Sequence, residues 1–368
     1  TATADKITRL DIVKQLNLRV TDKDVFVSSF DRPNLSLDVK RNFNKRQKLN
    51  YIESFIEGHD NQAGIIYCMA RKTTESLATD LQKLGIEAQP YHAGLSNDER
   101  NRIQNLFKMD QIQVICATVA FGMGIDKSNV RYVIHYNMPK NMEAYYQEAG
   151  RSGRDGEDGE CILLFSSQDI MLQKFLIDKS TENPERKSNE LNKLQAMVDY
   201  CHTPNCLRAY ILNYFGDHSN ISCQNCSNCQ DNSEVSDVTI DAQKVFSCVY
   251  RLKERFGVNM IADVLKGSKN KKVLQFGFDQ LPTYGLFKTK TVNEIKNFIN
   301  ILTATQYLSL AEGEFPIVKL TPEAYAVMKN EEKAEELRKL LPNHSCEILY
   351  GMDGFVAVST LPNVDVVV

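Results

Sequence analysis

The most constraining feature of this sequence is a regular alternation of short apolar runs with helical patterns between residues 5 and 165. Apolar or β-branched runs lie at 25–30 (VFVSSF), 64–69 (GIIYCM), 113–118 (QVICAT), 130–136 (VRYVIHY) and 161–165 (CILLF). Segments with helical apolar spacing, such as KITRLDIVKQL and NDERNRIQNLFK, separate these runs. Strands that alternate with helices of this length form a parallel sheet with flanking helices. We therefore expect an α/β fold for residues 1–165.

The pattern changes after residue 165. Between residues 171 and 215 the apolar spacing is helical throughout, as in LNKLQAMVDYC and LRAYILNYF, and the polar DNSEVSD that follows is typical of a linker. Three helical patterns and then two short strands, YLSL and IVKLT, come next, in the order of a winged helix. The predicted domains are 1–165, a helical cysteine-bearing subdomain at 166–235, and a winged helix at 236–345. The tail at 346–368 has no predicted role.

Composition narrows the class of protein. A chain of 368 residues is too long for one ordinary domain, and 42% hydrophobic with 25% charged residues is typical of soluble globular proteins. No run reaches the about 18 apolar residues that span a bilayer, and nothing resembles a signal peptide, so we expect an intracellular, reducing location and no membrane partner. The net charge of −3 hides a basic segment, 244–290, with ten Lys and Arg against three acids. Such a segment on an acidic chain indicates a surface that faces nucleic acid.

Five of the ten cysteines crowd between residues 201 and 229. Cys206, Cys223, Cys226 and Cys229 have the spacing C-x16-C-x2-C-x2-C, which suits a closed tetrahedral zinc site. Cys201 could compete with Cys206 for one position. A redox CxxC is disfavoured because three cysteines share one loop and no βαβ element surrounds it. Four thiolates leave no open position on a metal, so a zinc-dependent enzyme is disfavoured and the predicted site is structural.

Two loops carry residues suited to phosphate. In QVICATVAFGMGIDK a strand is followed by small residues, and loops of this kind bring backbone amides and a hydroxyl to a phosphate, while Asp126 could accept hydrogen bonds from a sugar hydroxyl. An ordinary βα loop is the alternative. In QEAGRSGRDG, Arg151 and Arg154 lie between glycines, which a helix would avoid. A surface turn with solvated charges is the alternative for this second loop.

Together these loops resemble motifs V and VI of superfamily-two helicases. The sequences ATVAFGMGIDK and YYQEAGRSGRDG resemble those motifs as they occur in the RecQ family. GIIYCMARKTTE resembles motif IV, YHAGLSNDER resembles the segment after it, and TATA at residues 1–4 resembles motif III. The cysteine cluster and the winged helix also occur in the order of RecQ proteins. The resemblance extends from residue 1 to about residue 340. Within the RecQ family, the sequence resembles Bloom-type members.

The resemblance implies a RecA-like domain and an ATP site. Motif VI of such helicases lines a cleft between two RecA-like domains, opposite the nucleotide. Matched to this motif, Arg154 is the expected arginine finger, Arg151 its partner on the phosphates, and Gln147 a residue that positions water or contacts motif V. Gly124 and Asp126 of motif V are expected to bind nucleotide. The implied parent protein is a 3′-to-5′ DNA helicase of recombination and repair that uses ATP with Mg²⁺, has repair or recombination proteins as partners, and is nuclear if eukaryotic.

The resemblance also implies a track for single-stranded DNA along the loops of the RecA-like domain. The expected DNA-binding residues there are Arg71, Lys72, His92 and Thr118. Each is a single polar residue in or next to a loop, so a solvated surface is the alternative.

A second predicted DNA surface is the lysine-rich segment LKGSKNKKV at 265–273. It carries Lys266, Lys269, Lys271 and Lys272 beside Gly267 and Ser268. In RecQ proteins the matching Gly-Ser segment meets duplex phosphates at the start of a helix, which implies that Ser268, Lys269 and Lys271 bind DNA. A solvated charge run is the alternative. Phe315, in the hairpin AEGEFP, could stack on a terminal base pair, although the acidic hairpin makes a poor wedge.

The sequence departs from the helicase pattern in one respect. Its 368 residues contain no GxxxxGKS, GxxxxGKT or DExH motif, so the phosphate-binding lysine and the magnesium carboxylate are expected on an N-terminal RecA-like domain. We expect these residues alone neither to hydrolyse ATP nor to unwind DNA. A non-catalytic DNA-structure-binding module with a vestigial motor is the alternative, against which the intact Arg151, Arg154 and Asp126 argue. The motifs do not exclude RNA; the cysteine cluster with a winged helix favours DNA.

Overall fold

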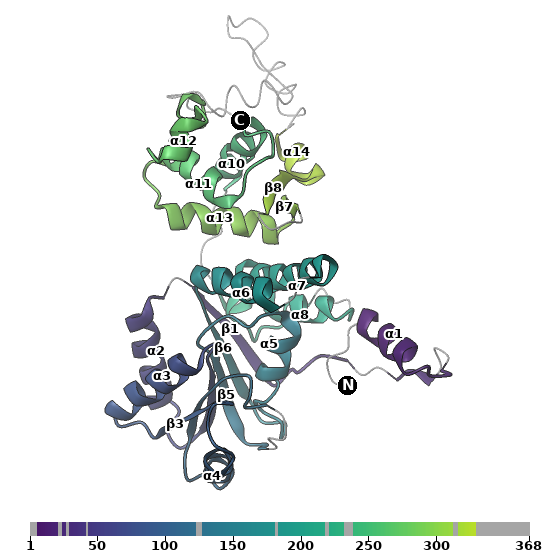
Figure 1. Cartoon of the computed structure of the whole chain (residues 1–368), viewed down its shortest axis with the longest axis vertical. Helices are drawn as coiled ribbons and strands as arrows, with labels where there is room; N and C mark the ends of the chain where they lie inside the picture. The colour runs from purple at the N-terminus through teal and green to yellow at the C-terminus, as the bar shows by residue number, and fades with distance from the viewer. Residues whose placement is uncertain are drawn as a thin grey trace, which may run out of the picture. The chain divides into compact units, whose positions relative to one another are not determined.

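The computed structural model describes residues 6–20, 24–26, 29–41, 43–122, 127–180, 183–217, 221–231, 238–311 and 316–328. The chain divides into two compact units, 1–201 with 205–232, and 233–368 with 202–204 (Figure 1). Within the described ranges, no helix has both the length and the apolar character needed to cross a membrane. The motif III residues 1–4 and the tail 346–368 lie outside the described residues.

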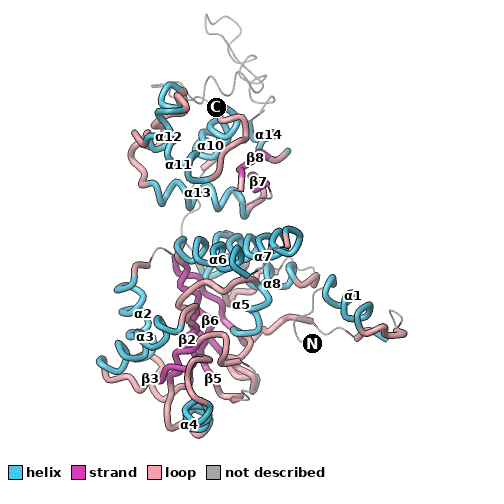
Figure 2. The backbone as a smooth tube through the Cα atoms, viewed as in Figure 1, coloured by secondary structure: helices cyan, strands magenta, loops and turns pink. Residues whose placement is uncertain are grey.

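A six-stranded parallel sheet organises the first unit (Figure 2). Its strands are β1 (Leu35–Arg41), β2 (Ala63–Tyr67), β3 (Ala88–Tyr91), β4 (Val114–Ala117), β5 (Val130–His135) and β6 (Gly159–Phe165). They lie in the order β1-β6-β5-β2-β4-β3, and every neighbouring pair is parallel. All six strands therefore end at the same edge. The predicted parallel α/β fold is confirmed.

Helices cover both faces of this sheet. The helices of the first unit are α1 (Lys6–Gln15), α2 (Lys45–Glu57), α3 (Arg71–Lys83), α4 (Asn97–Lys108), α5 (Met142–Ala149), α6 (Ser167–Ser180), α7 (Pro184–His202), α8 (Leu207–Tyr214) and α9 (Ser227–Gln230), and no residue of α1 belongs to the cores of the sheet. Neighbouring residues of β2 enter different cores: Ile66 packs with α2 and α3, and Ile65 packs with α4. A third core joins α5, α7 and α8 to β1 and β6. This alternation follows from the two-residue period of a strand that is buried on both faces.

The prediction of the strands was wrong at one place and incomplete at two. No strand forms in the described part of 25–30; Phe26 is 94% exposed, and Phe30 stacks on Phe215 with ring centroids 4.6 Å apart. The unpredicted strands β1 and β3 are the two edges of the sheet. Edge strands tolerate charged residues and proline, so LSLDVKR and AQPY lack the apolar runs that mark the central strands.

The second unit has the element order of a winged helix. It contains α10 (Thr239–Arg251), α11 (Val258–Lys266), α12 (Lys271–Gln275), the 3₁₀ turn η2 (Phe278–Gln280), α13 (Val292–Ala304), β7 (Leu308–Ala311), β8 (Ile317–Leu320) and α14 (Pro322–Met328). Strands β7 and β8 pair antiparallel, and one buried core joins them to α10, α11 and α13. The short helix α12 was not predicted. Asn270 starts it by accepting hydrogen bonds from the amides of Lys272 and Val273.

One glycine tests the packing of the central strands. A Cβ on Gly64 would lie 1.8 Å from Cε2 of Tyr132, whose ring is fully buried. We expect Gly64→Ala to lower the free energy of unfolding by about 3 kcal/mol, because a closely packed ring must move. Urea unfolding followed by circular dichroism measures the change. Gly58→Ala is the control, since its Cβ would meet its nearest atom at an ordinary 3.5 Å. Equal losses in both variants would contradict this account of β2.

Candidate functional site

The loops that follow the strands gather at the carboxyl edge of the sheet. The amide of Thr118, after β4, donates to the carbonyl of Tyr91 at the end of β3 over 3.1 Å. Arg71 opens α3 after β2, and its Nη1 would lie 3.1 Å from a Cβ on Gly94, in the loop after β3. Ligands of parallel sheets bind outside this edge, so these polar residues share the position expected of a site.

The predicted DNA-contact residues of this edge differ in accessibility. Arg71 and Lys72 are exposed and Thr118 is half-buried. His92 is only 3% exposed: its Nε2 lies 3.0 Å from a carboxylate oxygen of Glu75, and its Nδ1 accepts from the Gly94 amide over 3.2 Å. In this arrangement His92 shapes the turn at residues 92–94. Its contact with DNA stays a prediction.

The two arginines of QEAGRSGRDG follow α5. Gly150 is the C-cap of this helix, and a tight turn begins at Arg151. Arg154 and Gln147 are exposed, whereas Arg151 is half-buried, with its Nη2 2.9 Å from the position of a Cβ on Gly122. Gly122 belongs to the predicted motif V. The structure therefore brings the two predicted phosphate loops together, although Gly124 and Asp126 lie outside the described residues.

Buried polar residues that were not predicted lie beneath Arg151. The hydroxyl of Tyr67 donates to the Phe121 carbonyl over 2.7 Å, and burial raises the pKa of Tyr67 while the nearby Arg151 guanidinium opposes that rise. The ring of Tyr67 stacks on His135, whose Nε2 lies 2.9 Å from a carboxylate oxygen of Glu148. The phenol is thus a neutral hydrogen-bond donor. The sequence could mark Tyr67 and His135 only as polar residues at the ends of apolar strands.

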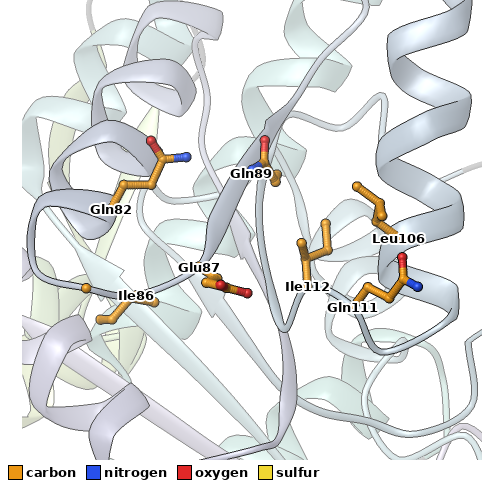
Figure 3. A pocket seen from close by; sticks show the side chains of 8 residues that line it. Gln82, Ile86, Glu87, Gln89, Leu106, Gln111 and Ile112 are labelled. Carbon is orange, nitrogen blue, oxygen red and sulfur yellow. The ribbon is translucent and has the colours of Figure 1, made fainter.

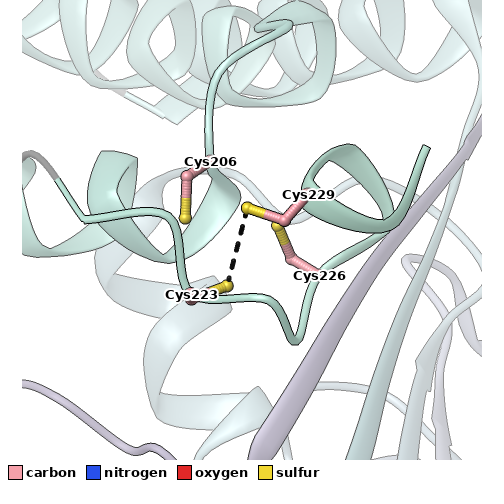
Figure 4. Close-up of side chains that lie close together, drawn as sticks. All are labelled: Cys206, Cys223, Cys226 and Cys229. Carbon is pink, nitrogen blue, oxygen red and sulfur yellow. Dashed lines mark hydrogen bonds between the residues drawn. The ribbon is translucent and has the colours of Figure 1, made fainter. Parts of the chain in front are cut away.

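The four predicted metal ligands form one cluster (Figure 4). The sulfur atoms of Cys206, Cys223, Cys226 and Cys229 all lie within 4.8 Å of one another, and the pair from Cys223 and Cys229 is 4.0 Å apart. Tetrahedral zinc with Zn–S bonds of about 2.3 Å places its sulfurs roughly 3.8 Å apart, so the cluster fits zinc. It contains Cys206 and not Cys201.

The zinc cluster joins α8 to the edge strand β1. Cys206 is the N-cap of α8, and the backbone of Cys226 forms an isolated parallel β-bridge with Leu37 of β1. The Leu37 amide donates to the Asn225 carbonyl over 3.3 Å. Because all four ligands are thiolates, the metal has a structural role and offers no position for a substrate.

The lysines of the lysine-rich segment in the second unit differ: one is hydrogen-bonded within the unit, and three are exposed. Lys266 donates to the carbonyls of Lys288 and Lys290 over 2.6 and 2.8 Å. Lys269, Lys271 and Lys272 are exposed. Ser268 follows the left-handed Gly267, and its amide donates to the Asp263 carbonyl over 2.8 Å. Phe315 lies outside the described residues.

A pocket elsewhere in the first unit contains none of the predicted site residues (Figure 3). Its lining is Gln82, Gly85, Ile86, Glu87, Gln89, Leu106, Gln111 and Ile112. These residues surround the starts of β3 and β4, at the edge of the sheet opposite the loops that follow β2, β3 and β4. The pocket is therefore separate from the candidate site.

Three family models match the chain in sequence order: the helicase conserved C-terminal domain at 47–156, the RecQ zinc-binding domain at 167–230 and the RQC domain at 232–340. The ATP-dependent DNA helicase RecQ of Bacillus subtilis is 45% identical over 331 residues, 90% of this chain and 55% of that protein. The ATP-dependent helicase SGS1 of Saccharomyces cerevisiae is 37% identical over 354 residues, 93% of this chain and 23% of that protein. The RecQ-like DNA helicase BLM of Xenopus laevis is 34% identical over 373 residues, 92% of this chain and 27% of that protein.

The parallel sheet, the four-thiolate site and the winged helix occur in the order of the three matched family models, a helicase conserved C-terminal domain, a RecQ zinc-binding domain and an RQC domain. The chain belongs to the RecQ family. It spans about half the length of the bacterial relatives it matches. The identity to bacterial RecQ is 45% and that to BLM is 34%, so a Bloom-type assignment stays a prediction.

The cysteine cluster predicts the metal content of the chain. We expect about one zinc ion per chain, and loss of that ion in Cys229→Ser, because a hydroxyl is a much weaker zinc ligand than a thiolate. Elemental analysis of the purified proteins measures it. Cys201→Ser is the control, since this buried residue is not among the four ligands. Loss of zinc from the control with retention in Cys229→Ser would overturn the assignment.

Proposed function

We propose that this chain is the C-terminal part of an ATP-dependent 3′-to-5′ DNA helicase of recombination and repair. It supplies an arginine finger, part of the track for single-stranded DNA, a structural zinc site and a duplex-binding winged helix. The observation that carries the proposal is the position of the arginine loop. Arg151 lies beside Gly122, in the loop after β4, and beside the buried Tyr67, and from there its guanidinium can reach a triphosphate held by a neighbouring domain.

In the proposed mechanism the arginines act on the γ-phosphate. The exposed Arg154 stabilises negative charge as it spreads in the transition state, and Arg151 binds the phosphates beside it. The exposed Gln147, one turn earlier on α5, orients water or contacts motif V. Gly124 and Asp126 hold the nucleotide. An N-terminal RecA-like domain brings the phosphate-binding lysine and the ligands of Mg²⁺, which neutralises phosphate charge when ATP is bound.

DNA binding is assigned to both units. In the first unit, Arg71 and Lys72, after β2, bind the backbone of single-stranded DNA. The hydroxyl of Thr118, after β4, donates a hydrogen bond to the same backbone. His92 shapes the turn after β3. In the second unit the proposed phosphate and base contacts are Ser268, Lys269, Lys271 and Phe315. Exposed lysines beside the start of a short helix match the requirement for phosphate binding, which is mainly electrostatic.

The proposal includes the domain limits and the setting of the protein. The limits are 1–165 for the RecA-like domain, 166–235 for the zinc-binding subdomain and 236–345 for the winged helix. The partners are DNA, the N-terminal RecA-like domain, and repair or recombination proteins. The proposed location is the nucleus if the source is a eukaryote.

The arginine finger is tested in a protein that carries an N-terminal RecA-like domain ahead of this chain. We expect Arg154→Ala to lower the kcat of DNA-stimulated ATP hydrolysis by about 10³-fold, because the transition-state charge loses its guanidinium. Steady-state phosphate release measures it. Arg102→Ala, which removes an exposed arginine of α4, is the control and keeps its activity. Full activity in Arg154→Ala would support the alternative, a DNA-structure-binding module with a vestigial motor.

The winged-helix surface is tested by the salt dependence of binding. We expect Lys269→Ala combined with Lys271→Ala to reduce the slope of log K against log salt by about 2, because each lost phosphate contact removes about 0.9. Fluorescence anisotropy with duplex DNA at several salt concentrations gives the slope. The control combines Lys83→Ala with Arg102→Ala, two exposed positive charges of the first unit. A slope equal to that of the control would reject the proposed surface.

A further inference from the structure

We propose that Arg32, on a segment held by Arg208 of the zinc-binding subdomain, is a positioning residue that fixes the loop carrying Arg151 and Arg154. The inference rests on the proposed function, because it names what holds the proposed finger in place. It concerns the arginine loop, residues 150–154, and the brace, residues 29–35, which runs into β1.

The arginine loop is attached to the start of β5, where the Gly153 amide donates to the Val130 carbonyl over 2.9 Å and the Ser152 hydroxyl donates to it over 3.3 Å, but its own carbonyls are bonded by a different segment. Gly150 and Gly153 have no side chains that pack, and Gly153 adopts a left-handed φ of +57°. A Cβ on Gly153 would lie 2.5 Å from Nδ2 of Asn34 and 2.5 Å from the Glu157 carbonyl, so only glycine fits. A loop of this kind is fixed through hydrogen bonds to its backbone.

Arg32 donates to these carbonyls of the loop. Its Nη2 donates to the carbonyls of Ser152 and Gly153 over 3.1 and 2.9 Å, and its Nη1 donates to Gly150 over 3.4 Å. These carbonyls follow the last turn of α5, where helix carbonyls are unpaired and the helix dipole favours a cation. The planar guanidinium bonds several acceptors at fixed angles, which an ammonium group cannot do.

Asn34 adds a second attachment from the same brace. Its Nδ2 donates to the Gly153 carbonyl over 2.9 Å and to the Glu157 carbonyl over 2.7 Å. Both sides of the turn that contains Arg154 are therefore tied to the brace. The position of the brace then decides where the two proposed phosphate-binding guanidinium groups lie.

The brace is held from its other side by the zinc-binding subdomain. Arg208 of α8 is 6% exposed; it donates to the Asp31 carboxylate over 3.2 Å and to the carbonyls of Pro33 and Leu35 over 3.1 and 2.7 Å. Arg208 is two residues from Cys206, the zinc ligand that caps α8. Arg208 of the zinc-binding subdomain thus fixes the brace, from which Arg32 donates to the arginine loop.

Aromatic packing fixes the start of the brace. Phe30 stacks on Phe215 with ring centroids 4.6 Å apart and ring planes 12° apart. The hydroxyl of Tyr146, on α5, donates to the Phe30 carbonyl over 2.8 Å. The brace is therefore attached to α5 as well as to the arginine loop that follows this helix.

The expected consequence is a loss of rate without a loss of fold or binding. A misplacement of reacting groups by about 1 Å can cost about 100-fold in rate. We therefore expect Arg32→Ala to lower the kcat of DNA-stimulated ATP hydrolysis by about 100-fold, and Arg32→Lys by about 10-fold, in a protein that carries the N-terminal RecA-like domain. Zinc content and melting temperature are expected to match the unaltered protein, and the KM for ATP is expected to stay within about threefold. Arg102→Ala is the control.

A double-mutant comparison separates positioning from general damage. In a background with both Arg151→Ala and Arg154→Ala, adding Arg32→Ala is expected to change the residual rate by less than about twofold, because Arg32 then has no finger to position. An equal further loss in that background would overturn the inference. If Arg154→Ala removes turnover and Arg32→Ala does not, the inference alone fails. If Arg154→Ala leaves turnover intact, the proposed function fails.

The link to the zinc-binding subdomain has its own variant. Arg208→Lys keeps a positive charge but cannot reach its three acceptors with the same geometry. We expect kcat to fall by about 10-fold with zinc content unchanged. Unchanged kcat in a protein that keeps its zinc would overturn the role of Arg208. Loss of zinc would overturn it as well, since the residue would then act on the metal site itself.

Discussion

The parallel direction of all six strands is the constraint on which the first unit depends. It places the ends of β2, β3 and β4 side by side, so that loops from distant parts of the sequence share one edge. The amide of Thr118 bonds the end of β3, and Arg151 approaches the loop after β4 near Gly122. None of these contacts requires a local sequence signal. The arginine loop follows α5 and not a strand: its Gly153 amide donates to the Val130 carbonyl at the start of β5, and the side chain of Arg151 reaches the loop after β4.

What the sequence predicted well is what local interactions determine. The helix at 97–108 starts after Ser96, whose side chain accepts from the Glu99 amide, and the helix at 292–304 starts with a capping box between Thr291 and Glu294. The central strands are apolar because both faces are buried. The edge strands β1 and β3 have no such signal. The apolar run at 25–30 gave a wrong prediction because the half-buried Phe30 stacks on Phe215, far along the chain, and does not pair in a sheet.

In the candidate site, too, the residues marked by local sequence motifs could be predicted and the residues that make long-range contacts could not. Cysteine spacing identified the metal ligands, because chelation imposes short intervals, and the glycine-rich motif identified Arg151 and Arg154. The residues that hold this loop escaped prediction. Arg32 bonds carbonyls 118 to 121 residues away, and a backbone acceptor leaves no trace in the identity of the residue that carries it. His92 was recognised as polar, but its burial against Glu75 follows only from the folded loop.

The brace also explains how a metal site without an open position can bear on chemistry at a distance. Four thiolates exclude a catalytic role, so zinc can contribute only by fixing geometry. Cys206 caps α8, and Arg208, on its first turn, is buried with its guanidinium on the brace. The two Nη groups of Arg208 bond three acceptors on the brace, and leaving a buried charge without its partner costs on the order of 3 to 5 kcal/mol. The brace is therefore tied to α8. Since Arg32 and Asn34 tie it to the arginine loop, the geometry of that loop depends on a subdomain that lies outside the sheet.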